Sequence, residues 1–210
     1  MTAVTFPSVA RRWRIATRLA QLWVLLAVGS PKALPDVDSH LVERARRGDA
    51  AAFVEIVRHY EPRLRALAYR LLDDRDLTDD VLQDVYIRAF KALGRFRGDA
   101  SLGTWLYRIT YNTCIDELRR GRKVVSLFSE HHADTEDARS GPEEVAIERG
   151  DLAAALASLA PELRAAVILV DVDGLDYAAA GGVLGIPAGT VGSRRNKARS
   201  VLRMALGVTG

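Results

Sequence analysis

Apolar residues recur at every third or fourth position along most of the chain, which is the spacing that places them on one face of an α-helix. From Asp38 onward this pattern is nearly continuous. Its longest stretch contains Pro62, where we expect a kink or a division into two shorter helices. The apolar face of this stretch consists of Phe53, Ile56, Val57, Tyr60, Leu64, Leu67, Ala68 and Leu71. Because the sequence has no alternating strand pattern of useful length, it predicts an all-α protein.

Capping residues and glycines divide the pattern into further helices. Thr78, which two aspartates follow, predicts a helix start, because a capping hydroxyl and first-turn acids stabilise a helix N-terminus. Residues 94–103 are expected to form mostly a loop, and Ser101 or Thr104 opens the next helix. That helix is expected to end at residues 119–121, Arg-Arg-Gly, since basic residues followed by glycine favour a helix C-terminus.

The segment SEHHADTEDARSGPEE interrupts the helical pattern. It is polar and lacks periodicity, and residues 124–150 hold seven acidic and two basic side chains. We therefore predict a flexible acidic linker over residues 124–147. It joins two small helical domains, at residues 36–123 and 148–208, and the chain is long enough for each of them to bury a core.

Residues 1–35 form an N-terminal extension with five basic side chains and no acid. Its basic start followed by the apolar run Leu22 to Val28 resembles a secretory signal peptide. The run is too short for a membrane-spanning helix, which needs about 20 apolar residues. Three interpretations stay open here: a secretion signal, an amphipathic or regulatory extension, and a start codon assigned too far upstream.

Composition narrows the possible chemistry. The 210-residue chain has one cysteine, Cys114, which excludes an internal disulfide framework and a thiolate metal cluster and favours a reducing, intracellular setting. His131 and His132 are adjacent, so they cannot readily share one metal ion without further ligands. We therefore expect no metal and no other cofactor. The net charge of +3 is small, but local charge patches matter more for binding than the total does.

The last two predicted helices have the spacing of a helix-turn-helix. Gly185-Ile186-Pro187 makes a sharp break, and Leu184 to Arg203 holds five basic residues and no acid. In a helix-turn-helix the second helix enters the major groove of DNA. With Thr190 as its cap, the side chains expected to face bases or phosphates are Thr190, Ser193, Arg194, Arg195, Lys197 and Arg199. An ordinary solvated helix in a helical hairpin is the alternative at this point.

Three segments together carry a family resemblance. They are, in order, DRDLTDDVLQDVYIRAF, FRGDASLGTWLYRITYNTCIDELRR and GLDYAAAGGVLGIPAGTVGSRRNKARSVLR. They resemble the extracytoplasmic-function (ECF) group of bacterial RNA polymerase sigma factors, over roughly Asp38 to Leu206. The resemblance implies a dissociable, non-enzymatic subunit in the cytoplasm that binds core RNA polymerase, recognises the minus-ten and minus-thirty-five promoter elements and takes no small-molecule substrate. It also implies an anti-sigma factor as a partner.

The resemblance assigns roles to residues of the first domain. The helix of LTDDVLQDV resembles the surface that clamps the largest polymerase subunit, and its polar positions are Asp79, Asp80, Gln83 and Asp84. The second segment resembles the part that melts and reads the minus-ten element. Melting needs an aromatic surface or pocket for unstacked bases and basic groups for phosphates. The matching candidates are Phe96, Arg97, Ser101, Trp105, Arg108, Tyr111, Asn112, Arg119 and Arg120.

Some of these candidates have a purely structural alternative. Trp105 is expected to pack in the core, because it sits on the same face as Leu102, Leu106 and Ile109. Phe96 suits the core and a base contact equally, and Arg108 can brace the domain from inside. By contrast, Asn112 and the pair Arg119-Arg120 are polar and lie off the apolar face, so contact with DNA is the better interpretation for them.

The chain departs from the family pattern in its helix-turn-helix. Gly181-Gly182 stand where alanine and a charged residue are usual, and Gly192 stands where a lysine is common. Glycine costs a helix roughly 1 kcal/mol relative to alanine. We therefore expect a less stable helix-turn-helix or a weaker grip on DNA.

Two other function classes remain to be weighed. One is a stand-alone helix-turn-helix regulator whose first domain is a sensor, which predicts a ligand pocket in that domain. The other is an all-helical, metal-dependent hydrolase that uses the six acids from Asp73 to Asp84, although these bunch at one helix start without a nearby histidine. A polymerase subunit stays in the cytoplasm, which disfavours a working secretion signal, and we expect residues 1–35 to be dispensable for promoter recognition.

Overall fold

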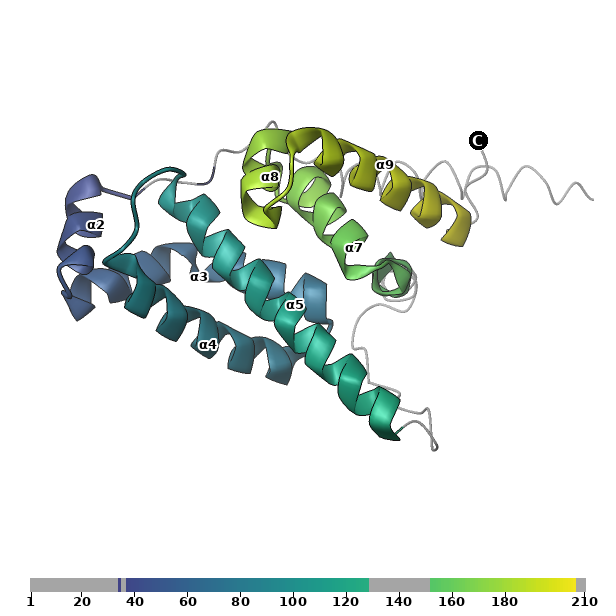
Figure 1. Ribbon diagram of the computed structural model, residues 1–210, viewed down its shortest axis with the longest axis horizontal. Helices are drawn as coiled ribbons and strands as arrows, with labels where there is room; N and C mark the ends of the chain where they lie inside the picture. Colours follow the sequence, from purple (N-terminus) through teal and green to yellow (C-terminus); the bar gives the residue numbers. More distant parts are fainter. Residues whose placement is uncertain (1–33, 35–36, 129–151, 207–210) are drawn as a thin grey trace, which may run out of the picture.

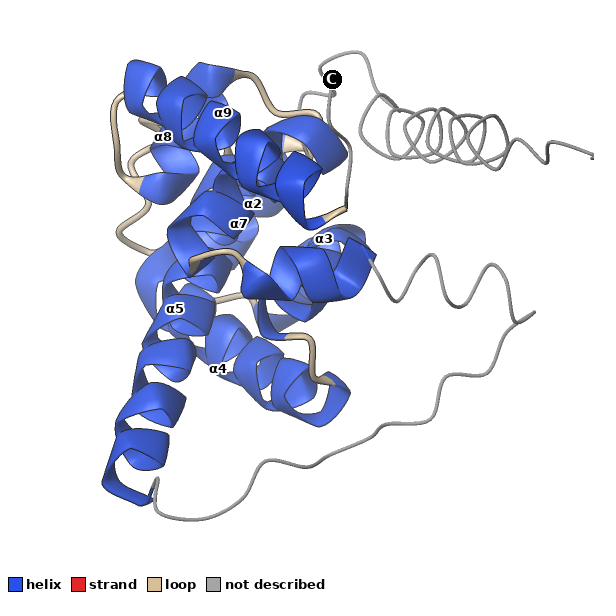
Figure 2. Cartoon of the chain, turned by 90° about the vertical axis from the view of Figure 1, so that its right-hand side faces the viewer, coloured by secondary structure: helices blue, strands red, loops and turns tan. Residues whose placement is uncertain are grey.

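The computed structural model describes residues 34, 37–128 and 152–206, and every regular element in this part of the chain is a helix (Figure 1, Figure 2). The all-α prediction is therefore confirmed. The elements are α2 (Ser39–Arg46), α3 (Ala50–Leu72), α4 (Arg75–Leu93), α5 (Leu102–Phe128), a helix at residues 152–158, α7 (Pro161–Val167), the π-helical turn η1 (Ile168–Val172), α8 (Tyr177–Leu184) and α9 (Ala188–Ala205).

Several sequence predictions fall outside the described residues. These are the predictions for the N-terminal extension, for His131 and His132, and for most of the acidic linker. Within the described residues, no helix is long and apolar enough to cross a membrane.

Aspartate side chains cap four of the helices. Each accepts a hydrogen bond from a backbone N–H of the first turn, at 2.7–3.0 Å, and the four are Asp38, Asp49, Asp74 and Asp176. The predicted start of α4 at Thr78 is wrong, because the cap is Asp74 and the helix begins at Arg75. Thr78 is instead buried, and its hydroxyl donates to the Asp74 carbonyl.

The limits of α5 and α9 also differ from their sequence signals. Of the two predicted openings of α5, Ser101 is the cap, since its Oγ accepts a hydrogen bond from the Thr104 backbone N–H at 3.1 Å. The helix does not end at Gly121 but continues to Phe128. Gly121 does not take the left-handed conformation that commonly ends a helix, and the helix continues through it. The predicted cap at Thr190 is wrong, because α9 begins at Ala188 after Pro187, and no side chain caps it.

The first domain is a bundle of α3, α4 and α5, with α2 packed against α3. The predicted apolar face of α3 is buried, except for the partly buried Val57. This helix of 23 residues runs through Pro62 without interruption. Pro62 is exposed, so its ring and its missing N–H lie on the solvent side, and the expected division into two helices does not occur.

The second domain contains the helix-turn-helix. α8 and α9 are joined by a turn at Gly185, whose φ of 67° is a left-handed conformation that favours glycine. The helix at residues 152–158 and α7 pack against the C-terminal half of α9. This packing forms a small apolar core of Ala155, Leu159, Val167, Ala198 and Leu202.

The two domains are in direct contact. α8 packs on α5, and α7 approaches α3, as both cartoon views show (Figure 1, Figure 2). Buried residues of α7, η1 and α8, such as Leu169 and Val183, belong to the same apolar cluster as Leu67 and Leu106 of the first domain. The apolar core is therefore continuous from one domain to the other.

Candidate nucleic-acid and protein interfaces

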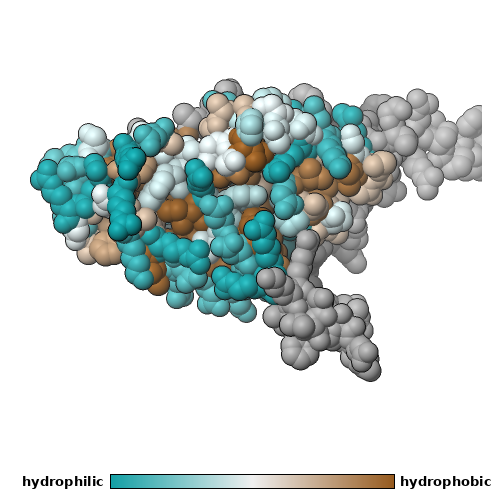
Figure 3. Space-filling model, viewed as in Figure 1, coloured by the Kyte–Doolittle hydropathy of each residue, from teal (hydrophilic) through white to brown (hydrophobic). Residues whose placement is uncertain are grey.

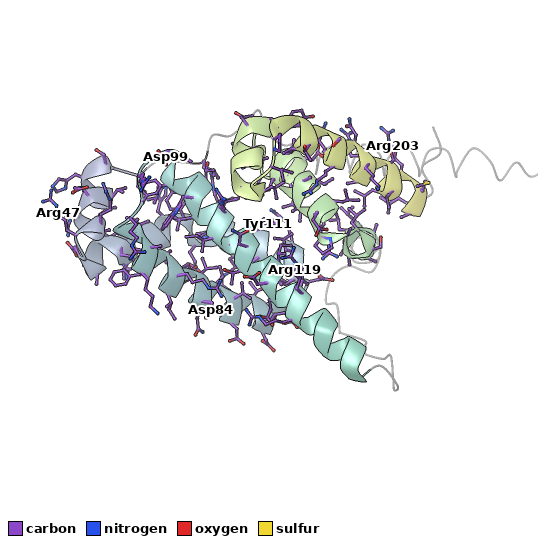
Figure 4. The ribbon with its side chains drawn as sticks, viewed as in Figure 1. Arg47, Asp84, Asp99, Tyr111, Arg119 and Arg203 are labelled. Atoms are coloured by element: carbon purple, nitrogen blue, oxygen red, sulfur yellow. The ribbon has the colours of Figure 1, made fainter. Side chains whose placement is uncertain are left out.

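The polar positions predicted on α4 lie together on one exposed face, which we call the acidic face. It consists of Asp79, Asp80, Gln83 and Asp84. Asp79 forms an ion pair with Arg65 of α3, and Asp84 lies 3.7 Å from Arg88. Asp80 makes no ion pair with any residue in the described part of the chain. In Figure 3, hydrophilic side chains dominate the edges of the molecule that α2 and α4 form. Figure 4 labels Asp84 on α4.

The sequence reasoning missed two apolar side chains on the same side of α4. Ile87 is 51% exposed and Phe90 is 42% exposed. The Phe90 ring packs against that of Phe53, with centroids 5.1 Å apart. Helical spacing places Ile87 about two turns and Phe90 about three turns beyond Asp80, on the same side of the helix. They could have been recognised in the sequence because they do not lie on the buried face of α4, which includes Val81, Leu82, Val85, Ala89 and Leu93.

The aromatic candidates for minus-ten contact come together at the start of α5. The rings of Phe96 and Trp105 lie 5.3 Å apart, and both side chains are partly buried against the core. Beside them, an open hollow of about 450 Å³ lies between α2 and the loop that precedes α5. Its polar lining includes Glu43, Arg46, Arg97 and Ser101. Glu43 and Arg46 could not be found from the sequence, because α2 lies about fifty residues earlier in the chain.

The remaining candidates on α5 divide into exposed and covered side chains. Arg108, Asn112 and Arg119 are exposed, and their spacing of four and seven residues places them on one helix face. Arg120 is exposed and pairs with Glu117 at 2.9 Å. Tyr111, in contrast, is only 7% exposed. Figure 4 shows it where α5 passes beneath the second domain.

The charges around Tyr111 come from both domains. Burial raises the pKa of its hydroxyl, and the carboxylate of Glu162 on α7 raises it further. Arg194 of α9 and Arg119 of α5 act in the opposite direction. A residue predicted to read the minus-thirty-five element therefore lies close enough to influence one predicted to read the minus-ten element.

Helix α9 presents fewer unpaired basic side chains than its sequence suggests. The Arg195 Nε donates to Asp171 at 2.9 Å and 3.0 Å, and another of its guanidinium nitrogens donates to the Tyr177 hydroxyl at 3.2 Å. Arg199 lies 3.9 Å from the same carboxylate. The Asp171 side chain is 4% exposed, and its hydrogen bond raises the pKa of Arg195. In this structure Asp171 therefore holds both arginines against the second domain.

Other candidates on α9 remain open to a duplex. Ser193 and Lys197 are exposed, while Thr190 and Arg194 are partly buried. Asn196, which the sequence reasoning missed, is exposed next to Lys197. Its amide has the donor and acceptor pattern that reads adenine in the major groove. The residue type is therefore the signal in the sequence that could have identified Asn196.

The glycines that seemed to weaken the helix-turn-helix have different surroundings. A Cβ on Gly181 would lie 2.7 Å from the Ile186 carbonyl oxygen, so the turn closes tightly onto α8 only because Gly181 has no side chain. A Cβ on Gly192 would lie 3.6 Å from the Tyr177 ring, which is an ordinary contact. Gly181 is therefore required by packing, and Gly192 is not.

The described residues give little support for thiol chemistry or for a metal site. Cys114 is fully buried, and burial raises the pKa of its thiol to about 12, so the reactive thiolate is scarce at neutral pH. No group of three or more His, Cys, Asp or Glu side chains in this part of the chain is placed to hold a metal ion. The acids from Asp73 to Asp84 thus do not form a metal centre among themselves.

Two family profiles match separate parts of the chain. The profile of the family described as Sigma-70 region 2 matches residues 56–124, and that of Sigma-70, region 4 matches residues 149–202. The chain is 37% identical over 183 residues to the RNA polymerase sigma-H factor of Pseudomonas aeruginosa, covering 80% of this chain and 93% of that protein. It is 35% identical over 177 residues to the ECF RNA polymerase sigma-E factor of Escherichia coli, covering 79% and 92%.

A solved structure is similar as well. It is a co-crystal structure of the sigma factor RpoE in complex with the anti-sigma factor NepR from Bartonella quintana. The TM-score is 0.60 at 28% identity, and the match covers 75% of this chain and 98% of that one.

Proposed function

This chain belongs to the ECF group of RNA polymerase sigma factors, and we propose that it works through three surfaces of its own, one for core polymerase and two for promoter DNA. It is a transcription initiation factor, and we assign it no catalytic activity of its own. One observation supports this assignment: the same chain carries all three surfaces. An exposed acidic and apolar helix face, an aromatic and basic surface beside a hollow, and a helix-turn-helix each fit one step of initiation.

The polymerase surface is the acidic face of α4 together with Ile87 and Phe90. Exposed carboxylates steer a basic partner into register, while burial of exposed apolar side chains supplies affinity. Ile87 and Phe90 follow Gln83 and Asp84 on the same side of the helix, so a partner helix laid along α4 contacts both kinds of group. Core RNA polymerase in the cytoplasm is the partner, and its largest subunit carries the complementary surface.

The minus-ten surface comprises the hollow beside Phe96 and the exposed face of α5. Base extrusion from a duplex requires a pocket for the unstacked base, and single-strand binding requires cations along the backbone. The hollow lies beside the Phe96–Trp105 pair and has Arg46 and Arg97 in its lining. Arg108, Asn112 and Arg119 continue from it along α5, where they hold the displaced strand.

The minus-thirty-five surface is the exposed side of α9. Ser193, Asn196 and Lys197 face the major groove, and Arg194 adds a cation next to them. Arg195 and Arg199 serve mainly to fix the angle of α9 through Asp171. The solved relative from Bartonella quintana is bound to an anti-sigma factor, and an anti-sigma factor is accordingly a partner of this chain that competes with polymerase.

Reconstituted transcription tests this assignment. The full chain is mixed with bacterial core polymerase and a pool of promoter fragments, and transcript 5′ ends are sequenced. We expect defined start sites that share upstream elements, and we expect the double variant Asp80→Lys, Asp84→Lys to abolish them while it remains folded. DNA binding without core-dependent starts would instead favour a stand-alone regulator.

A further inference from the structure

The chain that precedes α2 contacts the first domain at Leu34. This residue lies against Gly103, in the first turn of α5, where an added Cβ would come within 2.8 Å of the Leu34 side chain. The same Cβ would lie 3.1 Å from the ring of Tyr60 of α3, and Leu34 packs against the apolar core. Leu34 is therefore a fixed point, beside the start of α5, to which residues 1–33 are joined.

The position of this contact brings the preceding residues within reach of α4. Residues 94–101 suffice to join the end of α4 to the start of α5. Residues 27–33 form a link of nearly the same length before Leu34, and an extended link of this length reaches about 25 Å. The residues before Ala27 can therefore lie along α4, from the end that carries Phe90.

The exposed side of α4 changes in character along the helix. Asp76 is exposed about one turn before the acidic face, so the N-terminal half of α4 presents carboxylates. Ile87 and Phe90 follow in the C-terminal half, where they expose apolar surface. Asp80 makes no ion pair with the described residues, so its charge is available to a partner. A segment that fits this side is basic at one end and apolar at the other.

Residues 11–26 have the matching order of charge and hydrophobicity. Arg11, Arg14 and Arg18 recur at helical spacing, and this segment contains no acid. Leu22 and Leu26 continue the same spacing. In a parallel alignment with α4, Arg11, Arg14 and Arg18 come opposite Asp76, Asp80 and Asp84, while Leu22 and Leu26 come opposite Ile87 and Phe90. The parallel direction also brings residue 26 to the end of α4 that the link to Leu34 can reach.

We propose that residues 11–26 bind as a helix along the exposed side of α4, parallel to it, and that they compete there with core polymerase. The competition rests on the polymerase surface assigned above. Opposite charges fix the register of the segment, and the short link to Leu34 raises its local concentration at α4. The apparent affinity of the chain for polymerase is then reduced by the fraction of molecules in which α4 is free.

Disulfide trapping in the full chain, without polymerase, tests the alignment. Leu19→Cys comes opposite Gln83→Cys, at an exposed position of α4, in the parallel arrangement. Cys114 is fully buried, so it does not compete for oxidation by copper–phenanthroline. We expect this pair to form a disulfide in most of the chain. The matched control combines Leu19→Cys with Met204→Cys, an exposed position of the second domain, and is expected to stay largely reduced.

Charge reversal in the segment tests the competition. A substitution on α4 would weaken both contacts, so the test variants lie in residues 11–26, where they change the intramolecular contact alone. The double variant Arg14→Glu, Arg18→Glu is expected to bind core polymerase about tenfold more tightly, because it frees α4. The double variant Arg14→Lys, Arg18→Lys keeps both charges and is expected to match the unmodified chain. Fluorescence anisotropy measures the affinities, and circular dichroism verifies that each variant is folded.

Each outcome bears on the proposal. Equal disulfide yields in the two cysteine pairs would overturn it, and so would an unchanged or reduced affinity of the charge-reversal variant for polymerase. Sedimentation of the full chain with phosphatidylglycerol vesicles, without the Leu19–Gln83 disulfide, would overturn it in favour of a membrane surface as the partner of the segment. Formation of that disulfide in a chain that fails to bind polymerase, with or without charge reversal, would support the contact with α4 and count against the assigned function.

Discussion

The Arg70 guanidinium donates a hydrogen bond of 2.7 Å to Asp173, and these two residues, 103 positions apart in the chain, join the two domains. Only one oxygen of the Asp173 carboxylate takes part. The other is buried without a hydrogen-bond partner among the described residues. Burial raises the pKa of Asp173 to about 6, although Arg70 and Arg63 of α3 both lower it. The carboxyl also lies near Tyr107 of α5 and raises that hydroxyl's pKa further above its ordinary value.

The raised pKa of Asp173 predicts a pH dependence of the free energy of unfolding. In the folded chain the Asp173 carboxyl keeps its proton up to a higher pH than an exposed carboxyl does, so this contribution to stability is fully present below pH 3.8 and is lost as the pH rises through about 6. Over this window the effect is about 3 kcal/mol. Chemical denaturation should therefore show a larger contribution of Asp173 to the free energy of unfolding at pH 5 than at pH 7.5.

Asp173→Asn provides the control for this pH effect. Its neutral amide resembles the protonated carboxyl in shape and charge, so this variant should lose less stability between pH 5 and pH 7.5 than the unmodified chain does. An unchanged slope in this variant would assign the titration to another group.

The Arg164 side chain predicts a large loss of stability on truncation. It is 8% exposed and donates to the carbonyls of Leu71 and Ala157, with a longer contact of 3.4 Å to Leu159. Arg164→Met leaves buried carbonyls without donors, and each unsatisfied group costs about 1–3 kcal/mol. Chemical denaturation should show a loss of roughly 2–4 kcal/mol. Arg203→Met, at an exposed position of α9, serves as the control and should change stability by less than about 0.5 kcal/mol.

Sequence patterns predicted the helices well where the signal was local. The apolar face of α3 is buried as expected, because a spacing of three and four residues reflects burial directly. Helix starts were harder to predict, since Asp74 and Thr78 are both capping residues and only the folded chain selects Asp74. The end of α5 was missed because Arg119-Arg120-Gly121 satisfies a helix stop signal without adopting the left-handed turn.

Long-range pairs account for what the sequence could not predict. Arg195 resembles a DNA-reading cation until Asp171, 24 residues earlier, is seen to hold it. Gly182 resembles a defect in a helix until Thr104 of the other domain appears 3.3 Å from its missing side chain. An acidic linker between two helical segments gives no information about contact between them. Only the assembled structure reveals these three relationships.

The exposed apolar residues of α4 predict a specific loss of polymerase binding. Ile87→Ser removes apolar surface that the folded domain does not use, so stability should be unchanged while affinity for core polymerase falls roughly tenfold, or about 1.4 kcal/mol. Fluorescence anisotropy of the labelled chain against core polymerase measures this. Tyr69→Ser changes an apolar residue of α3 that is 40% exposed and lies outside the proposed surface. An equal loss of affinity in this control would mean that Ile87 is not part of a defined interface.

The two neighbouring cations of α9 are expected to behave differently on DNA. Lys197 is exposed and makes no ion pair with the described residues, so Lys197→Ala should lower the salt dependence of duplex binding by about one phosphate contact, a slope change near 0.9. Arg195→Ala should leave that slope nearly unchanged, because Asp171 already neutralises the guanidinium. It should instead lower the melting temperature of the chain. Anisotropy titrations at several salt concentrations distinguish the two, and identical slope changes would contradict the role given to Asp171.

The glycines of the helix-turn-helix predict opposite responses to the same substitution. Helix propensity alone favours alanine over glycine by roughly 1 kcal/mol at both Gly181 and Gly192. At Gly181, however, the new Cβ would lie 2.7 Å from the Ile186 carbonyl oxygen, and this backbone atom moves only if the turn itself shifts. Gly181→Ala should therefore destabilise the chain by about 1–3 kcal/mol.

At Gly192 the Cβ meets only the Tyr177 ring, at an ordinary 3.6 Å, so Gly192→Ala should be neutral or stabilising. Thermal denaturation of the two variants measures both effects. If both alanines stabilised the protein, the glycines would simply be weak helix formers, as the sequence suggests. Opposite signs would show that Gly181 is retained because the turn closes tightly onto it. They would also show that packing does not require glycine at residue 192.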